Sequence, residues 1–202
     1  DQQKDFLRLV NELNRIQMRS GYSGDADLEA RIANYELAAR MQLAATNVAD
    51  ISKESEATRK LYGLDDPKSG HYSSCCLMAR RLVENGVRFV TVINGGWDHH
   101  SNIKENLTNL CYRTDQGVAA LLTDLESRGL LDETLVVWSG EFGRLPTIEQ
   151  NQANPGRDHN PYGFNLWMAG AGVKSGYDYG LTDDLGYAAV DEFKITHSDV
   201  HA

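Results

Sequence analysis

The sequence has no apolar run that approaches the ~18 to 20 consecutive residues needed to cross a bilayer. It also has few cysteines. The three present, Cys75, Cys76 and Cys111, match no zinc-binding spacing and cannot all be paired within the chain. We therefore expect no membrane span, and we interpret the cysteines as small buried hydrophobic residues.

Positive charge is scarce as well, because 20 Lys and Arg residues stand against 29 Asp and Glu residues, for a formal net charge of -9. Such a chain repels a polyanion at long range, and no stripe of Lys and Arg interleaved with aromatic residues offsets the repulsion locally. The composition therefore predicts no nucleic-acid partner. A small anionic substrate stays compatible with it, since a bound divalent cation inverts the local field of an acidic cleft.

Apolar residues make up 41% of the chain and charged residues 24%, as in an ordinary globular domain. Apolar residues at helical spacing predict helices over 2–19, 26–45 and 102–128, the last ending at Gly129. We predict a further helix over 73–84, closed by Asn85-Gly86. The economical interpretation is one α/β domain over residues 51–202. Residues 1–50 then form a helical cover of that domain or an insertion.

Three short segments predict strands: 87–93, 134–138 and 164–169. The first is rich in β-branched and aromatic residues and short enough for a buried strand, and the third is an apolar run that would extend the same sheet. The order strand, helix, strand is typical of a parallel crossover, which is right-handed in nearly all proteins. Ligands of such sheets bind outside the carboxyl ends of the strands. The residues that follow the first two strands are therefore the first candidates for a site.

The first of these segments is GGWDHHSN, at residues 95–102. It places Asp98 and His100 in a D-x-H arrangement on a loop that two glycines make permissive. A carboxylate with imidazoles suits Zn²⁺ or a similar cation. In the alternative interpretation Asp98 and His99 cap the following helix, and His100 is solvated.

The second segment is SGEFGR, at residues 139–144, which leaves the second strand. A strand that ends in this way exposes Glu141 at the rim, where the carboxylate can act as a metal ligand or a general base. Arg144 can hold a tetrahedral anion through two hydrogen bonds. A surface salt bridge between such residues is the alternative.

A third segment, PGRDHNP at residues 155–161, carries Arg157, Asp158 and His159 between two prolines. Loops this stiff around charged residues tend to hold functional side chains in place. His159 is the candidate here, and the alternative is an ordinary turn in which Asp158 bonds its own backbone. No serine lies in the context of a nucleophile elbow.

Longer blocks of the sequence resemble one family over essentially the whole chain. These blocks are LYGLDDPKSG, CLMARRLVENGVRFVTV, GGWDHHSN, RTDQGVAALLTDLESRGLLDETLVVWSGEFGR, GRDHNPYGFNLWMAGAGVKSG and the closing DVHA. They resemble an uncharacterised family of sulfatase-like proteins, family fifteen-oh-one of the domains of unknown function. That family is placed in the alkaline phosphatase and sulfatase superfamily.

The resemblance implies part of an alkaline-phosphatase-like three-layer α/β/α sandwich with a mainly parallel sheet, preceded by a helical segment. It also implies divalent metal, Zn, Ca, Mn or Mg, at the carboxyl end of the sheet. Its ligands would be Asp98, His100, Glu141 and His159. Phe142 departs from the superfamily, because it stands where an alkaline phosphatase has its second histidine, and it leaves the number of metals open.

The resemblance further places the nucleophile upstream of residue 1 and implies an exported protein. The predicted function is metal-dependent hydrolysis of small or polymeric phosphate or sulfate esters, with Glu141, Arg144 and His159 in catalytic roles. A non-catalytic binding or structural protein on a degenerate scaffold is the alternative, and Phe142 supports it. A mutase that moves phosphate within a sugar is a third reading of the same residues.

Overall fold

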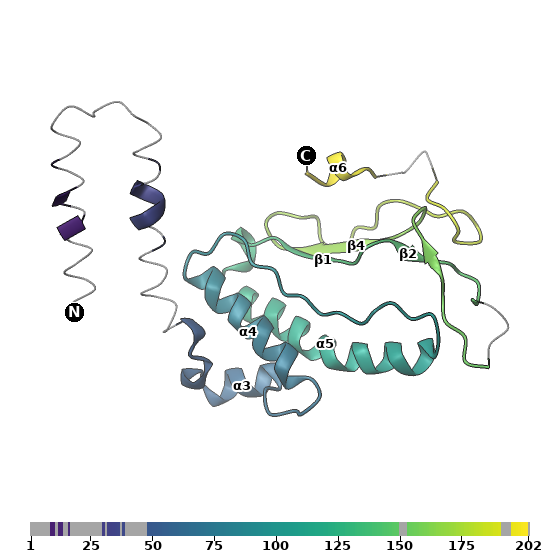
Figure 1. Ribbon diagram of the computed structural model, residues 1–202, viewed down its shortest axis with the longest axis horizontal. Helices are drawn as coiled ribbons and strands as arrows, with labels where there is room; N and C mark the ends of the chain where they lie inside the picture. The colour runs from purple at the N-terminus through teal and green to yellow at the C-terminus, as the bar shows by residue number, and fades with distance from the viewer. Residues whose placement is uncertain are drawn as a thin grey trace. The chain divides into compact units, whose positions relative to one another are not determined.

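The computed structural model describes most of the chain, and Figure 1 shows its elements. The described residues are 48–149, 153–190 and 195–201, together with 9, 10, 12, 13, 16, 30, 32–36 and 38. Contacts divide the chain into two units, Asp1–Asp50 and Ile51–Ala202. Every described residue from 9 to 49 is helical. The rest of the helices predicted over 2–19 and 26–45 lies outside the described residues, and a cover or insertion at 1–50 stays a prediction.

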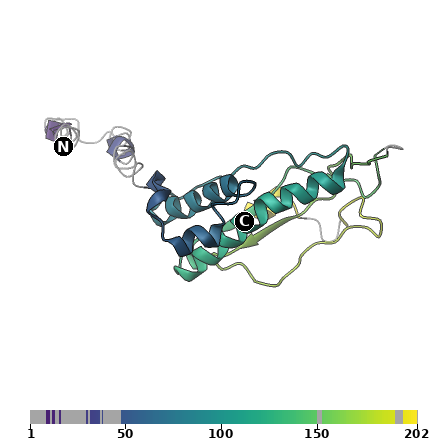
Figure 2. The same cartoon turned by 90° about the horizontal axis from the view of Figure 1, so that it is seen from below.

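Helices α4 (Gly70–Glu84) and α5 (Ile103–Ser127) lie side by side in the second unit (Figures 1 and 2). Both confirm helices predicted from the sequence, and both end at the predicted glycine positions. Gly86 and Gly129 follow them with φ angles of 83° and 67°, a conformation that favours glycine. Among the described residues, no helix has the combined length and apolar character that crossing a bilayer requires.

Helix α3 (Glu56–Tyr62) lies outside the four segments predicted to be helical. Its first turn is capped by Ser55, whose hydroxyl accepts a hydrogen bond of 3.1 Å from the backbone N–H of Thr58. It ends at Gly63, in the left-handed conformation. Short 3-10 turns precede α3 and follow α5, at η1 (Ile51–Lys53) and η2 (Leu131–Glu133).

The three helices enclose a small apolar core. Its buried members are Tyr62, Tyr72, Cys76, Leu77 and Ala120. The predicted burial of the cysteines is confirmed for Cys76, whereas Cys75 and Cys111 are half-buried.

A buried arginine joins the helices to one another. Arg80 of α4 is 2% exposed. Its guanidinium contacts three carboxylates: Glu84 at 2.6 Å, Glu54 at 2.8 Å and Asp124 at 2.9 Å. Its Nη1 donates an aligned hydrogen bond to Glu84, while Nε and Nη2 meet the other two carboxylates as ion pairs without hydrogen-bond alignment. Because Tyr62 of α3 also donates to Asp124, at 3.2 Å, the network reaches all three helices.

The charges of this network compensate for its burial. Burial raises the pKa of Glu54, but the hydrogen bonds and charges of Arg81 and Arg80 outweigh it, so the pKa of that carboxyl is lowered. Burial and the carboxylate of Asp124 together raise the pKa of the Tyr62 hydroxyl, which therefore stays a hydrogen-bond donor. Removing one partner would leave buried charge uncompensated.

Two small antiparallel sheets complete the second unit. Strand β1 (Val136–Ser139) pairs with β4 (Leu166–Ala169), and β2 (Gly143–Arg144) pairs with β3 (His159–Asn160). The last element is α6 (His197–His201). The strands predicted over 134–138 and 164–169 are confirmed within two residues.

The fold is therefore mixed α/β, and the mainly parallel sheet of an alkaline-phosphatase-like three-layer sandwich is not shown. A parallel pair needs a crossover connection, usually a helix, between its strands. Between β1 and β4 the described residues form only β2, β3 and turns. The chain therefore returns to β1 in the antiparallel direction.

The strand predicted over 87–93 belongs to no sheet of the described residues. The alternation of inward-facing and exposed side chains expected of a strand is present, because Val92 packs against the core while Phe89 and Ile93 are 91% and 83% exposed. No neighbouring strand is hydrogen-bonded to it, however, and a sheet requires one. The parallel crossover predicted through this segment is therefore wrong.

All three tryptophans of the chain gather between this segment and the first sheet. Trp138 and Trp167 stack across β1 and β4 with ring centroids 6.1 Å apart, and Trp97 meets Trp138 edge-on, also at 6.1 Å. These contacts hold the chain next to β1 just before Asp98. The first candidate segment is thereby fixed at the sheet.

The buried network predicts a large loss of stability for Arg80→Ala. The free energy of unfolding should fall by about 3–5 kcal/mol, because Glu54 and Asp124 lose their buried counter-charge. Urea unfolding followed by circular dichroism measures this. Arg59→Ala is the matched control, since Arg59 pairs with Asp65 at the surface and should cost at most about 1 kcal/mol. Equal losses in the two variants would contradict a structural role for the network.

Candidate metal centre

Two loops that are distant in sequence run alongside each other near the start of α5. Ser101 and Pro155 form an antiparallel bridge between them. Gly156 permits this approach, because a Cβ atom there would lie 2.1 Å from the carbonyl carbon of His100. The segment with Asp98 and His100 is therefore held beside the stiff loop that carries His159.

The short pair β2 and β3 brings in the second candidate segment, residues 139–144. Arg144 of β2 lies opposite His159 of β3. Gly143 is required there, because a Cβ atom would lie 1.9 Å from a backbone carbonyl oxygen. Asn160, 1% exposed, anchors β3 by donating a 2.8 Å hydrogen bond to the carbonyl of Tyr187. The position of His159 is thus set by backbone pairing on one side and a buried amide on the other.

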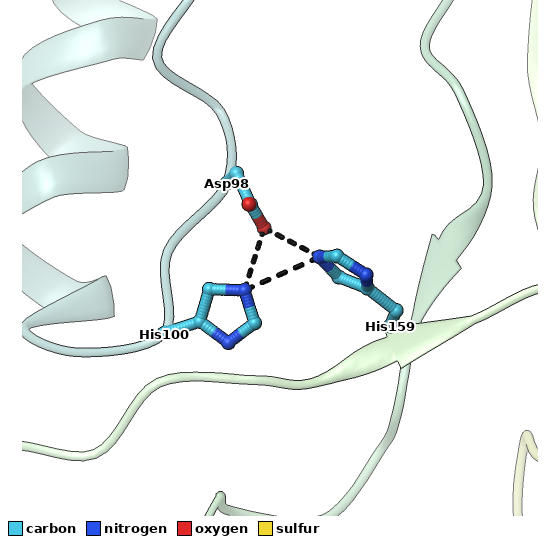
Figure 3. Close-up of side chains that lie close together, drawn as sticks. All are labelled: Asp98, His100 and His159. Carbon is cyan, nitrogen blue, oxygen red and sulfur yellow. Dashed lines mark hydrogen bonds and ion pairs between the residues drawn. The ribbon is translucent and has the colours of Figure 1, made fainter.

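Asp98, His100 and His159 direct their side chains toward one another (Figure 3). The Oδ1 atom of Asp98 lies 3.2 Å from His100 Nε2 and 2.9 Å from His159 Nε2, and the two Nε2 atoms are 3.2 Å apart. We call these three atoms the ligand triangle. The side chains are 50%, 43% and 39% exposed, so the triangle is accessible from solvent.

The ligand triangle fits a divalent cation. Around a tetrahedral ion with bonds of about 2.0 to 2.1 Å, ligand atoms lie about 3.3 Å apart, and the three distances here are close to that value. Two imidazole nitrogens with one carboxylate oxygen suit Zn²⁺, and also Fe²⁺, whereas Mg²⁺ and Ca²⁺ prefer oxygen ligands alone. Of the predicted metals, the donor set therefore favours Zn²⁺.

Arg144 borders the ligand triangle. Its Nη2 donates to Oδ1 of Asp98 at 3.1 Å and to Oε1 of Glu141 at 3.0 Å. The ring of Phe142 lies 5.4 Å from the guanidinium carbon and 4.5 Å from the His159 ring. A guanidinium at the edge of a cation site is placed to bind an oxyanion that reaches the same cation.

The pKa values of Asp98 and His100 in the triangle are shifted in opposite directions. The hydrogen bond from His159, followed by the charges of His100, His159 and Arg144, holds the pKa of Asp98 below its usual range. The hydrogen bond to Glu149, followed by the charges of Asp98, Glu149 and Asp158, raises the pKa of His100. Protons and a metal ion therefore compete for His100.

The structure brings together Asp98, His100 and His159. Glu141 joins them only through Arg144 and belongs to no group of described residues whose potential ligand atoms all lie within 4.8 Å. His99 is 8% exposed and takes no part in the triangle. The metal assignments of the four predicted ligands stay predictions.

Sequence reasoning missed Glu149. Its Oε2 lies 2.7 Å from Nδ1 of His100, and with Asp158 these residues form a second group whose ligand atoms lie within 4.8 Å. Asp158 also accepts a 2.7 Å hydrogen bond from the backbone N–H of His159, much as the turn interpretation supposed. The polar stretch around Glu149 carries no local signal, and only the folded chain shows its proximity to His100.

A family model described as "Protein of unknown function (DUF1501)" matches residues 1–202. No curated protein and no solved structure matches the chain. The predicted likeness to family fifteen-oh-one is therefore confirmed over the whole chain. A link to sulfatases stays a prediction.

The charge arrangement predicts that Asp98→Asn lowers the pKa of His100, because it removes a neighbouring negative charge. In the native protein the raised pKa adds stability that is fully present below the unfolded value of about 6.5 and is lost as the pH rises through the folded value. Side-chain NMR titration of His100 measures the change. Glu126→Gln, at the other end of α5, removes the same charge and should leave His100 unaffected. An unchanged His100 in Asp98→Asn contradicts the prediction.

Proposed function

The chain belongs to the DUF1501 family, and we propose that it is a metal-dependent hydrolase of phosphate or sulfate esters. The observation that carries the proposal is the ligand triangle, in which Asp98, His100 and His159 bring three potential ligand atoms within 3.2 Å of one another beside the guanidinium of Arg144. In this proposal the triangle holds the cation. When bound, a divalent cation polarises the ester oxygen and activates the attacking group.

Arg144 has the role of binding the ester oxyanion. Its Nη2 contacts the ligand triangle directly, and its Nε makes no hydrogen bond within the described part of the chain. Phe142 supports the planar guanidinium from one side. Arg144 therefore places a positive charge next to the site where an anion would bind, although its Nε is buried and its terminal nitrogens already donate hydrogen bonds.

Glu141 is proposed as the general base. Its side chain is 57% exposed, and its Oε1 is held by Arg144 at 3.0 Å. A carboxylate in this position can accept a proton from a group that approaches the ligand triangle. No serine, threonine or cysteine of the described residues makes a hydrogen bond to Asp98, His100 or His159. The attacking group is therefore assigned to no residue here.

A non-catalytic binding protein is the second candidate, and Phe142 favours it. The ring fills the space between His159 and Arg144, where a further polar ligand would be needed for a second metal. A protein of this kind would bind the cation and an anion without turnover. The export implied by the family likeness is proposed equally for both candidates.

Metal binding tests the proposal first. We expect the full chain to bind Zn²⁺ more tightly than Mg²⁺ or Ca²⁺, with Fe²⁺ and Mn²⁺ included in the same chelator-competition titration. His159→Ala should weaken Zn²⁺ binding by at least roughly 100-fold, since loss of a mere outer partner costs 10- to 100-fold. His71→Ala, an exposed histidine of α4, is the control. If the wild-type protein binds none of these ions, the proposal is wrong.

Arg144→Lys tests the anion site. Lysine keeps the charge but loses the planar fork, so kcat/KM toward an aryl phosphate or aryl sulfate should fall by roughly 10- to 100-fold, at about 1.5 to 3 kcal/mol for a charge-assisted hydrogen bond. Zn²⁺ affinity should change little. Tight metal binding in the wild type without turnover of either ester would favour the non-catalytic candidate.

A further inference from the structure

Glu149 contacts the side of the His100 ring that faces away from the ligand triangle. In Figure 3 one ring nitrogen of His100 points to Asp98 and His159, and the other points away from both. That second nitrogen, Nδ1, lies 2.7 Å from Oε2 of Glu149. The Glu149 side chain is only 20% exposed, the least of the acidic side chains around the triangle.

We propose that Glu149 is a positioning residue that keeps the hydrogen of His100 on Nδ1, so that the Nε2 lone pair is available to a cation. The role in cation binding rests on the proposed function. The assignment of the hydrogen does not rest on it.

The hydrogen is assigned by counting donors and acceptors. A neutral imidazole has one N–H and one bare nitrogen, and a carboxylate only accepts. A distance of 2.7 Å is that of a charge-assisted hydrogen bond, so Nδ1 of His100 carries the hydrogen and donates it to Glu149. Nε2 of the neutral ring is then bare.

With a bare Nε2 on His100, the ligand triangle has too few hydrogens for each of its three contacts to be a hydrogen bond. His159 can donate one hydrogen to Oδ1 of Asp98, but the lone pair of His100 Nε2 then faces that oxygen, 3.2 Å away. Lone pairs this close repel each other unless a positive centre lies between them. Glu149 thus prepares His100 to bind a cation, in the arrangement of carboxylate, histidine and metal that is common in metal sites.

The backbone holds Glu149 in place independently of the triangle. Its N–H donates to the carbonyl of Gly156 at 3.2 Å. Gly156 itself lies against the backbone of His100, where no other residue would fit. One glycine therefore fixes the distance between the carboxylate and the imidazole that it orients.

Asp158 offers a competing role for the same carboxylate. Because His100, Glu149 and Asp158 have potential ligand atoms within 4.8 Å, the three residues could hold a second cation. The 2.7 Å contact favours a hydrogen bond, since two ligands of a tetrahedral ion lie about 3.3 Å apart. The metal stoichiometry separates the two roles.

The experiment compares Glu149→Met and Glu149→Gln with the wild type. Methionine keeps the length of the side chain and removes both oxygens, while glutamine restores one neutral acceptor. In the metal-free protein, 15N shifts of neutral His100 should show hydrogen on Nδ1 in the wild type, less in Glu149→Gln and least in Glu149→Met. Zn²⁺ affinity by chelator competition should fall in the same order, by roughly 10- to 100-fold for methionine. Glu126→Gln is the charge control, and thermal unfolding checks that each variant is folded.

Two results would overturn the proposal. One is a His100 hydrogen distribution in Glu149→Met equal to that of the wild type. The other is binding of two Zn²⁺ per chain in the wild type and one in Glu149→Met, which would make Glu149 a ligand. If the wild type binds none of the divalent ions titrated above, the proposed function fails, while the NMR comparison still decides whether Glu149 sets the hydrogen position.

Discussion

The candidate site depends on the close backbone contact between residues 99–103 and 154–157. Within it, the N–H of Arg157 donates to the carbonyl of His99 at 2.9 Å, and the N–H of Asn102 donates to the carbonyl of Asn154 at 3.0 Å. Only glycine at position 156 allows the two backbones to come this near. Because the contact is made by backbone groups, it brings the side chains of two loops together without using their charges, which stay available for binding.

The charged residues of the helical core and those of the ligand triangle therefore differ in how fully their charges are compensated. In the helical core, Arg80 meets three carboxylates and Asp124 is shared with Arg128 and Tyr62, so each buried charge has a counter-charge. At the ligand triangle the balance is incomplete, since a single oxygen of Asp98 lies within 3.2 Å of nitrogen atoms of Arg144, His159 and His100. A network in which every charge has a counter-charge favours a rigid scaffold. An exposed network whose charges are not fully compensated favours the binding of a ligand.

The sequence was informative wherever the signal was local. A segment closed by Asn85-Gly86 located α4, apolar periodicity located α5, and short apolar runs located β1 and β4, because each of these patterns is local to its element. The direction of strand pairing leaves no such trace, so the antiparallel sheets were not foreseen. Helix α3 was missed because it has only 7 residues and buries only Tyr62, so it carries no apolar stripe. Glu149 was missed because its contact with His100 spans 49 positions of the chain.

The residues of the triangle were expected to meet, but for a different physical reason from the one that the structure gives. The prediction brought Asp98, His100 and Glu141 together at the carboxyl ends of neighbouring parallel strands. In the structure His159 reaches the triangle through its antiparallel pairing with Arg144, and Asp98 is positioned by the edge-on contact of Trp97 with Trp138. Glu141 follows β1, but its side chain contacts Arg144 rather than the histidines. The rim of a parallel sheet, which would have directed this side chain inward, is not part of the described structure. Since convergence here comes from glycine-permitted backbone contacts and aromatic stacking, changes at Gly143, Gly156 or Trp97 should displace the ligand atoms more than changes within β1 and β4.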